Sequence, residues 1–268
     1  MIENRFKTAL ETKKALSIFF TAGYPRLNDT LPIISALTDS GADLIEIGFP
    51  FSDPISDGPT IQESSQIALK NGMSLKVLFK QLSEVRSVTS IPLLLMGYIN
   101  PVEQYGFESF LSDAARCGVD GAIIPDMPFD RYQSEYKSLF KRHGVKPVFL
   151  VTTRTPQERI KAFDQEEPAF LYLLSSDAVT GGAVSITQDR DDFFRRVAAM
   201  GLKSPLIVGF GVRDRETFNS VTRHTNGAII GSAFTRALSS VVASPTDSAR
   251  SDEAGLRTVV KEFIEGVR

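Results

Sequence analysis

The sequence predicts an α/β fold of the (β/α)8 barrel type, because short β-type runs alternate with helix-like stretches along the whole chain. Most of these runs are continuously apolar, as is typical of parallel strands covered on both faces. A parallel strand followed by a helix, repeated eight times, is the pattern of a TIM barrel of about 250 residues. With 268 residues, we expect a single barrel domain over residues 1–268.

Eight runs are the predicted strands: Leu16–Thr21, Asp43–Phe49, Ile91–Tyr98, Gly121–Pro125, Pro147–Val151, Ala169–Leu174, Pro205–Gly209 and Gly227–Ile230. The segments between them are amphipathic and predict the barrel helices, the clearest being Leu31–Asp39, Phe107–Arg116, Tyr132–His143, Pro156–Phe163, Asp191–Met200 and Arg215–Arg223. The alternation is strict, which favours a closed barrel over a sheet with separate helical and strand-rich parts.

Additional helices are expected at three places. Residues Ile2–Lys13 carry Phe6, Ala9 and Leu10 on one face, which predicts an extra N-terminal helix closing the barrel's N-terminal end. Two helices, Thr60–Asn71 and Ser74–Ser87, are expected between the second and third strands, and Leu256–Val267 forms a last helix. The polar, serine-rich segment 239–255 is interpreted as a loop before that last helix.

Composition excludes several classes of function. The chain has 30 Lys and Arg against 32 Asp and Glu, so no excess of charge indicates nucleic acid or anionic lipid. The single cysteine, Cys117, excludes an internal disulfide framework, and the two histidines, His143 and His224, fall at predicted helix ends. No metal site is therefore expected. Residues Met1–Lys7 lack the apolar core of a signal peptide, and no apolar run approaches a membrane span of about 20 residues, so we expect a cytoplasmic protein.

Glu46 interrupts the apolar second strand near its carboxyl end, where the active sites of such barrels lie. Strand alternation places Leu44, Glu46 and Gly48 on one face. If that face points into the barrel, burial raises the pKa of Glu46, which suits a group that gives and takes protons near neutral pH. The alternative is a buried structural glutamate paired with an arginine or a backbone donor.

The loop 51–59 that follows is dense in turn-forming residues and includes Asp53 and Asp57. Asp-Pro and Asp-Gly pairs are ordinary turn chemistry, which is one interpretation of both aspartates. Because the loop follows Glu46 at the same end of the barrel, Asp57 can also bring a second carboxylate to one pocket. Asp53 is the weaker candidate of the two.

Glycines near the end of the chain predict a phosphate site. Gly209 and Gly211 end the seventh strand, and Gly231 with Ser232 ends the eighth and opens the helix 233–238. Loops after these two strands of a barrel often bind phosphate at a helix N-terminus. The alternative is that the glycines only permit tight turns. A third glycine is missing for a dinucleotide-binding fingerprint.

The segment 174–187 is long, rich in small residues and follows the sixth strand. One interpretation is a lid that closes over substrate and excludes water. The other is a plain long loop, and length alone does not distinguish the two.

Residues Leu44–Gln62 closely resemble the signature of the tryptophan synthase α subunit family, with Glu46 and Asp57 both in place. The likeness extends over nearly the whole chain, through Phe19–Pro25, Leu95–Pro101, Pro125–Pro128, Tyr172–Ser175, Val179–Gly181, Gly209–Gly211 and Gly231–Ser232. The resemblance implies a lyase that cleaves indole-3-glycerol phosphate to indole and glyceraldehyde 3-phosphate by a reverse aldol step, with no cofactor in this chain.

Site roles follow from the same resemblance. Glu46 corresponds to the general acid–base that protonates indole C3 and helps to remove the glyceryl hydroxyl proton, and Asp57 to the carboxylate that holds the indole N–H. The substrate-binding positions are Phe19, Met96 and Phe210 around the indole, Tyr172 beside Glu46, Gly181, Gly211, Gly231 and Ser232 around the phosphate, and Thr180 in the lid, which contacts Asp57 on closure. Ser176 and Ala178 depart from the arginine and glycine expected in the lid.

The resemblance also implies a partner, a β subunit that carries pyridoxal phosphate, receives indole through a tunnel and joins it to serine in an α2β2 heterotetramer. Segments Phe51–Gly58 and Asn100–Gly106 correspond to the docking surface. Two rivals stay open. One is another phosphate-binding barrel, such as a sugar-phosphate isomerase or indole-glycerol-phosphate synthase. The other is a catalytically silent chain that only activates its β partner.

Overall fold

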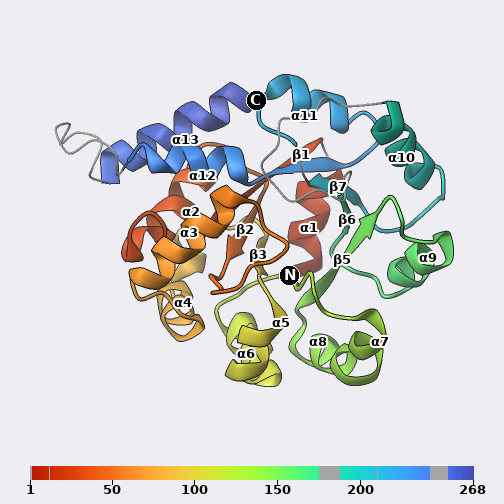
Figure 1. Ribbon diagram of the computed structural model, residues 1–268, viewed down its shortest axis with the longest axis horizontal. Helices are drawn as coiled ribbons and strands as arrows, with labels where there is room; N and C mark the ends of the chain where they lie inside the picture. The colour runs from red at the N-terminus through yellow and green to blue at the C-terminus, as the bar shows by residue number, and fades with distance from the viewer. Residues whose placement is uncertain (1, 12, 175–187, 210, 242–252) are drawn as a thin grey trace.

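The computed structural model describes residues 2–11, 13–174, 188–209, 211–241 and 253–268, which form a closed barrel of parallel strands inside a ring of helices (Figure 1). Each strand pairs with the next along the chain, and β8 pairs with β1. The strands are β1 (Ala15–Thr21), β2 (Leu44–Gly48), β3 (Leu93–Met96), β4 (Gly121–Ile123), β5 (Lys146–Thr152), β6 (Leu171–Leu174), β7 (Leu206–Gly209) and β8 (Gly227–Ile230). The predicted fold class is confirmed.

Strand bounds differ from the sequence prediction most at β3, which is four residues long rather than the run Ile91–Tyr98. Pro92 precedes the strand and has no backbone N–H to donate to the ladder, so the strand begins after it. At the other end Tyr98 is already the N-cap of a helix. That helix, α5 (Ile99–Tyr105), was not predicted, although Pro101 in its first turn is a helix-compatible position.

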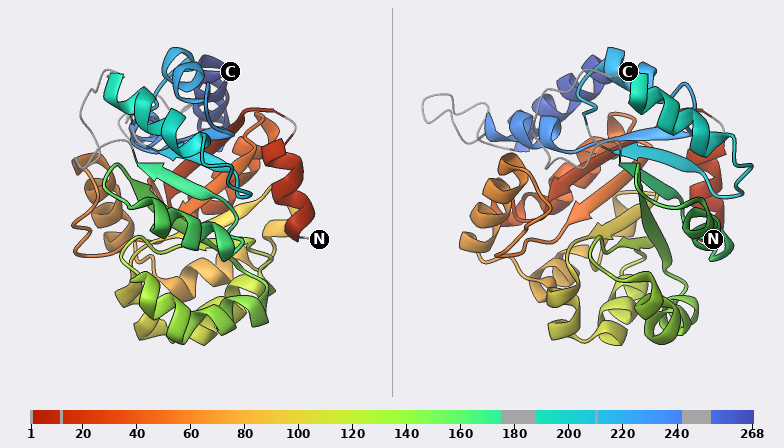
Figure 2. Two further views of the ribbon diagram at one scale, coloured as in Figure 1. Left: turned by 90° about the vertical axis from the view of Figure 1, so that its right-hand side faces the viewer. Right: turned by 45° about the vertical axis from the view of Figure 1, so that its right-hand side comes forward.

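Helices cover the outside of the barrel (Figures 1 and 2). Their bounds are α1 (Ile2–Glu11), α2 (Thr30–Asp39), α3 (Pro59–Lys70), α4 (Leu75–Leu82), α5 (Ile99–Tyr105), α6 (Phe107–Arg116), α7 (Phe129–Arg131), α8 (Lys137–His143), α9 (Gln157–Gln165), α10 (Gln188–Ala198), α11 (Arg215–Val221), α12 (Ser232–Ser239) and α13 (Glu253–Val267). Short 3-10 turns at Leu27–Asp29 and Val85–Ser87 and a π-helical turn at Tyr132–Tyr136 complete them. The predicted helix Tyr132–His143 is the π turn followed by α8, and α7 comes directly before it.

The barrel interior is a core of its own, separate from the layer between strands and helices. Alternate strand residues such as Leu44, Leu94 and Ile207 fill it, as period-2 alternation predicts. Phe6, Ala9 and Leu10 of α1 are buried in the same cluster. This confirms that the extra helix closes one end of the barrel, and it leaves the opposite end for a binding site.

Buried ion pairs hold α1 at its end of the barrel. Asp120, at the start of β4, is fully buried and accepts from Arg5 of α1, with 2.8 Å between Arg5 Nε and Asp120 Oδ1. Its other carboxylate oxygen accepts from Arg86 and from the Leu93 backbone N–H. These donors satisfy the buried carboxylate, and loss of Arg5 would leave part of it unpaired, so the position of α1 depends on an ion pair as well as on apolar packing.

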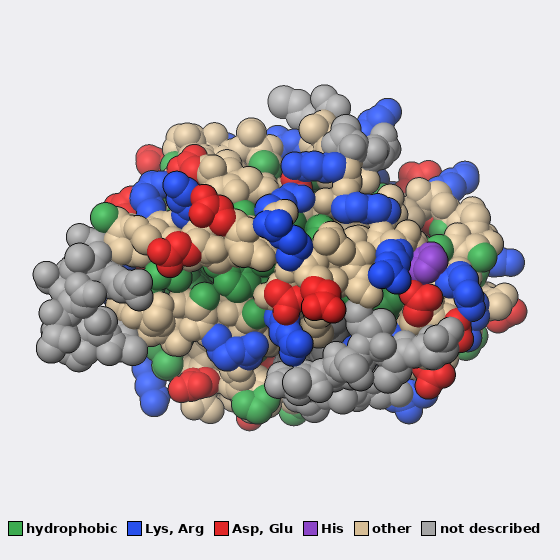
Figure 3. Space-filling view, turned by 90° about the horizontal axis from the view of Figure 1, so that it is seen from above, with side chains coloured by type: hydrophobic (Ala, Val, Ile, Leu, Met, Phe, Trp, Pro, Cys, Tyr) green, Lys and Arg blue, Asp and Glu red, His purple; other side chains and the backbone are tan. Residues whose placement is uncertain are grey.

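Basic and acidic side chains are interspersed on the face of the molecule seen in Figure 3, so no single-sign field covers that face. Within the described ranges, no helix combines the length and the apolar character needed to cross a membrane. Cys117 is buried at the C-cap of α6, where it packs in the core layer between strands and helices.

Candidate active site

A cavity of about 290 Å³ opens at the carboxyl ends of the strands, where the barrel architecture predicts the site. Its walls are mostly apolar and include side chains from several different strands and loops. Among the residues that the sequence analysis singled out, the lining includes Phe19, Asp57, Met96, Tyr172, Gly211, Gly231 and Ser232. Glu46 is not a lining residue. Thr180, Gly181 and Phe210, and all of the expected lid beyond Leu174, lie outside the described residues.

Glu46 lies on β2 in the barrel interior and is 0% exposed. The Ser17 hydroxyl of β1 donates a hydrogen bond of 2.7 Å to Glu46 Oε1, and Oε2 has no partner within the described part of the chain. Burial raises the pKa of Glu46 to about 8, and the Ser17 bond opposes this rise. The burial expected from strand alternation is thus confirmed.

Ser17 is the partner that sequence reasoning missed. The pairing considered for a structural glutamate was an arginine or a backbone donor, and the structure has a hydroxyl instead. The sequence did contain a signal for this partner. Ser17 lies two residues before Phe19 on the same strand, so the two side chains point to the same, inward face.

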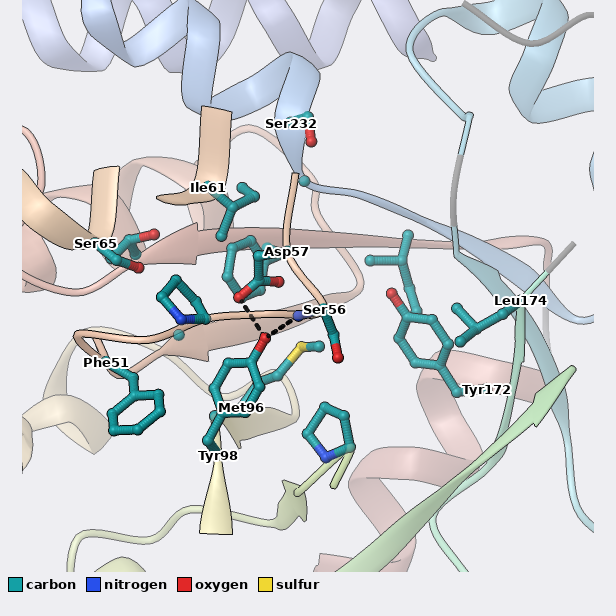
Figure 4. Close-up of a pocket in the computed structure, with 18 of the residues that line it drawn as sticks. Phe51, Ser56, Asp57, Ile61, Ser65, Met96, Tyr98, Tyr172, Leu174 and Ser232 are labelled. Carbon is teal, nitrogen blue, oxygen red and sulfur yellow. Dashed lines mark hydrogen bonds between the residues drawn. The ribbon is translucent and has the colours of Figure 1, made fainter. Parts of the chain in front are cut away.

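Asp57 reaches the cavity from the loop after β2, and a tyrosine holds its carboxylate (Figure 4). Tyr98 Oη donates to Asp57 Oδ2 at 3.1 Å and accepts from the Ser56 N–H at 3.0 Å. Gln62 Nε2 donates to the Asp57 carbonyl at 2.8 Å, which anchors the turn to α3. Burial raises the pKa of Asp57 to about 6, and the Tyr98 bond opposes the rise.

The other aspartate of this loop, Asp53, is exposed and bonds its neighbour Ser52. Its position agrees with the turn interpretation. The sequence predicted no role for Tyr98 at the site, and its role as the partner of Asp57 follows from the structure.

The phenol of Tyr172 on β6 interacts electrostatically with both Glu46 and Asp57. Burial raises its pKa well above 10, and the charges of Glu46 and Asp57 raise it further. Its hydroxyl points into the cavity (Figure 4). A neutral phenol there adds a hydrogen-bonding group without adding a charge.

Two glycines make room for aromatic rings rather than for a ligand. A Cβ atom added to Gly209 would lie 2.2 Å from the ring of Tyr172, and one added to Gly48 would lie 2.5 Å from the ring of Phe19. In the sequence, Gly209 falls in the group of glycines predicted to bind phosphate. The structure instead gives it a packing role, because any side chain there would displace Tyr172.

The predicted phosphate end lies where β7 and β8 finish. Gly211 has φ +76, a conformation that favours glycine, and lines the cavity together with Gly231 and Ser232. Gly231 is the N-cap of α12, so the first N–H groups of that helix lie at the cavity edge, near Ser232 (Figure 4). Free N–H groups and the helix dipole favour an anion at this edge.

In the part of the chain that the structure describes, no group of three or more His, Cys, Asp or Glu residues is arranged to hold a metal ion. The cavity brings together the Asp57 carboxyl, the Tyr172 phenol, an apolar wall and the edge formed by Gly211, Gly231 and Ser232, while the Glu46 carboxyl is buried and does not line it.

A closed (β/α)8 barrel with ionisable groups at the carboxyl end of its strands is the architecture of a barrel enzyme. The family model of the tryptophan synthase alpha chain matches residues 6–266. The chain therefore belongs to the tryptophan synthase alpha chain family, whose members are lyases that cleave indole-3-glycerol phosphate.

Individual relatives agree with this assignment. The tryptophan synthase alpha chain of Flavobacterium psychrophilum is 52% identical over 236 residues, which cover 88% of this chain and 93% of the relative. That of Parabacteroides distasonis is 47% identical over 239 residues, with 88% and 93% covered.

Solved structures give the same result. The alpha chain from Legionella pneumophila superposes with a TM-score of 0.84 at 28% identity, over 99% of this chain and 97% of that one. A chain of the tryptophan synthase complex from Pyrococcus furiosus gives a TM-score of 0.80 at 34% identity, over 95% and 98%. The fold and enzyme class expected from the sequence are confirmed.

Proposed function

We propose that Glu46 and Asp57 are the catalytic pair with which this chain carries out the reaction of its family, the cleavage of indole-3-glycerol phosphate. The observation that supports this is the difference between the two carboxyls: burial raises the pKa of Glu46 to about 8 and that of Asp57 to about 6. Near pH 7 Glu46 holds its proton and Asp57 is ionised. Two carboxyls in different environments can thus act as acid and as anion in one site.

In this mechanism Glu46 first gives its proton to indole C3. The positive charge that develops on the ring is stabilised by the Asp57 carboxylate, which accepts a hydrogen bond from the indole N–H. The Glu46 carboxylate then takes the proton of the glyceryl hydroxyl. The electron pair of that O–H bond forms the aldehyde C=O, and the pair of the breaking C–C bond restores the indole ring. Atoms and charge balance, and Glu46 ends the cycle protonated.

Glu46 has to turn toward the cavity for this chemistry, since it bonds Ser17 and does not line the cavity. As Glu46 turns, it loses the hydrogen bond from Ser17 and contacts the substrate instead. Phe19 and Met96 form the wall proposed for the indole ring, and Gly211, Gly231 and Ser232 the edge proposed for the phosphate. The resemblance adds Phe210 to the indole wall, Gly181 to the phosphate edge and Thr180 as a contact of Asp57.

The experiment that tests this function measures indole release from indole-3-glycerol phosphate by the purified chain, alone and with a β subunit. The chain contains no tryptophan, so indole fluorescence is measured against a quiet background. Release in either condition supports the proposal. A chain that raises β-subunit activity without releasing indole is a silent activator, and the catalytic proposal then fails.

The pH dependence of kcat/KM is expected to be bell-shaped with limbs at about 6 and about 8. The rate rises as Asp57 loses its proton and falls as Glu46 loses its own. In Ser17→Ala the alkaline limb moves to higher pH, because the Ser17 bond lowers the pKa of Glu46. Initial rates across this range check both statements. A profile that does not change in Ser17→Ala contradicts the assignment of the alkaline limb to Glu46.

We also propose the partner that the family implies, a pyridoxal-phosphate β subunit that receives indole in an α2β2 assembly, with the cofactor held by that subunit alone. A solved relative is a tryptophan synthase complex, which supports a β subunit as partner. The proposed docking surface is Phe51–Gly58 with Asn100–Gly106, beside the cavity mouth. We place residues 1–268 in one domain and the protein in the cytoplasm, as the composition indicates.

Ile55 is expected to be a main contact of that docking surface, because this large apolar side chain is 83% exposed at the cavity mouth. Ile55→Asp should weaken β-subunit binding about tenfold or more by titration calorimetry. Leu69→Asp is the matched control, since Leu69 is 37% exposed on α3, outside the proposed surface. Equal losses in both variants contradict the proposed location.

A further inference from the structure

Arg190 is a buried arginine that the proposed mechanism does not use. It lies in the first turn of α10 and is 6% exposed. Its Nη2 atom is buried and has no hydrogen-bond partner within the described residues, and no ion pair there joins it to a carboxylate. Burial lowers its pKa, with no acidic neighbour opposing the shift.

Two other partly buried arginines of the barrel, unlike Arg190, have a carboxylate as ion-pair partner. Arg5 and Arg86 are both half-buried, and both donate to the Asp120 carboxylate. A guanidinium stays protonated, so one that is buried without an anion carries an uncompensated charge. Such a charge is costly unless a ligand supplies the anion.

Arg190 lies beside Gly211, at the predicted phosphate end of the cavity, although it is not one of the residues that line the cavity. A Cβ atom built on Gly211 would lie 3.5 Å from Arg190 Nη1 and 4.0 Å from Nη2. Gly211 itself lines the cavity, together with Gly231 and Ser232 at the start of α12. The guanidinium therefore lies within van der Waals reach of Gly211, at the rim where an anion is expected.

We propose that Arg190 is an additional anion-binding residue of this site, which donates hydrogen bonds to a phosphomonoester dianion seated on Gly211, Gly231 and Ser232. The identity of the anion as the substrate's phosphate rests on the proposed function. Backbone N–H groups supply direction but only partial charge, whereas a guanidinium supplies a full charge and several donors. Arg190 thus favours the doubly charged phosphate over neutral groups of similar shape.

Two arginines line the cavity, which Arg190 itself does not, and each differs from Arg190. Arg213 is exposed and pairs with Asp214 at 3.2 Å, and Arg236 is exposed and donates to Thr60 at 3.3 Å. Water and salt screen exposed charges far more than buried ones. The buried Arg190 is therefore expected to contribute more to anion affinity than either of them.

The test compares Arg190→Gln and Arg190→Lys with the unaltered chain. Binding of inorganic phosphate and of glycerol 3-phosphate is measured by calorimetry, and binding of indole by fluorescence. In Arg190→Gln the Kd of both phosphates is expected to rise about tenfold to hundredfold, and indole binding to stay unchanged. Arg190→Lys, which keeps the charge but not the fork of donors, should lie between.

Turnover gives a second readout. In Arg190→Gln the KM for indole-3-glycerol phosphate should rise much more than kcat falls, because the phosphate is remote from the bond that breaks. Arg195→Gln is the matched control, since Arg195 lies on the same helix, is exposed and pairs with Asp192. It should change none of these values.

Several outcomes overturn the proposal. They are unchanged phosphate affinity in Arg190→Gln, a parallel loss of phosphate and indole binding, which indicates a structural role, and no phosphate binding by the unaltered chain. If the Gln variant does not fold, an unchanged phosphate Kd in Arg190→Lys overturns it. A chain that binds phosphate through Arg190 but cleaves no indole-3-glycerol phosphate supports this inference and contradicts the proposed function.

Discussion

Glu46→Gln is expected to reduce indole release by about a thousandfold, within the range of about 10²–10⁴ that general acid–base catalysis contributes. Gln has nearly the shape of Glu but neither gives a proton to indole C3 nor takes one from the glyceryl hydroxyl. The loss should fall on kcat, because Glu46 acts through its proton transfers in the transition state and does not line the cavity in which the substrate binds. A direct indole assay measures it, and phosphate binding by the same variant should be unchanged. Turnover near the unaltered rate contradicts the acid–base role.

The same substitution should make the protein more stable. The pKa of Glu46 is raised from 4.5 to about 8 in the folded chain, so between these values the folded state holds a proton that the unfolded state has released. Stability is then lost as pH rises through this window, by up to several kcal/mol at the alkaline end. Gln is neutral and carries no such penalty.

Urea unfolding on either side of that window measures the effect. Glu46→Gln should be more stable than the unaltered chain above pH 8, and the gain should shrink toward pH 4.5. Lost activity together with gained stability is the pattern of a residue retained for chemistry rather than for folding. A variant that is less stable at alkaline pH indicates a structural role for Glu46.

Asp57→Asn is expected to reduce kcat by about a hundredfold, somewhat less than Glu46→Gln. The amide keeps the size of the side chain and its place beside Tyr98, but it has no charge to stabilise the positive ring. The acid limb of the pH profile, at about 6, should vanish with the carboxyl. Initial rates of indole release against pH give both results.

Asp53→Asn is the matched control for this change. Asp53 lies in the same loop, is exposed and bonds only its neighbour Ser52 among the contacts described for it. Its substitution should leave kcat and the pH profile unchanged. Equal losses in the two variants point to the loop as a whole rather than to the Asp57 charge.

Hydrophobic patterns within short stretches of the sequence predicted most of the fold. Continuous apolar runs separated by amphipathic segments predicted the parallel barrel, and the face formed by Phe6, Ala9 and Leu10 predicted that α1 closes one end. Such patterns suffice because the period of side chains along a helix or strand is set by the backbone. Local rules failed where a proline or a turn intervened, as at β3 and in the unpredicted α5.

The sequence by itself also determined the positions of Glu46 and Asp57, since one interrupts an apolar strand and the other follows it in a turn. Only the tertiary structure decided what surrounds them. Ser17 bonds Glu46 across 29 residues of chain and Tyr98 bonds Asp57 across 41, and no spacing rule connects such pairs. The approach of Arg190 to Gly211 is of the same kind. Burial and long-range contacts set the pKa values of the two carboxyls, and both exist only once the barrel has closed.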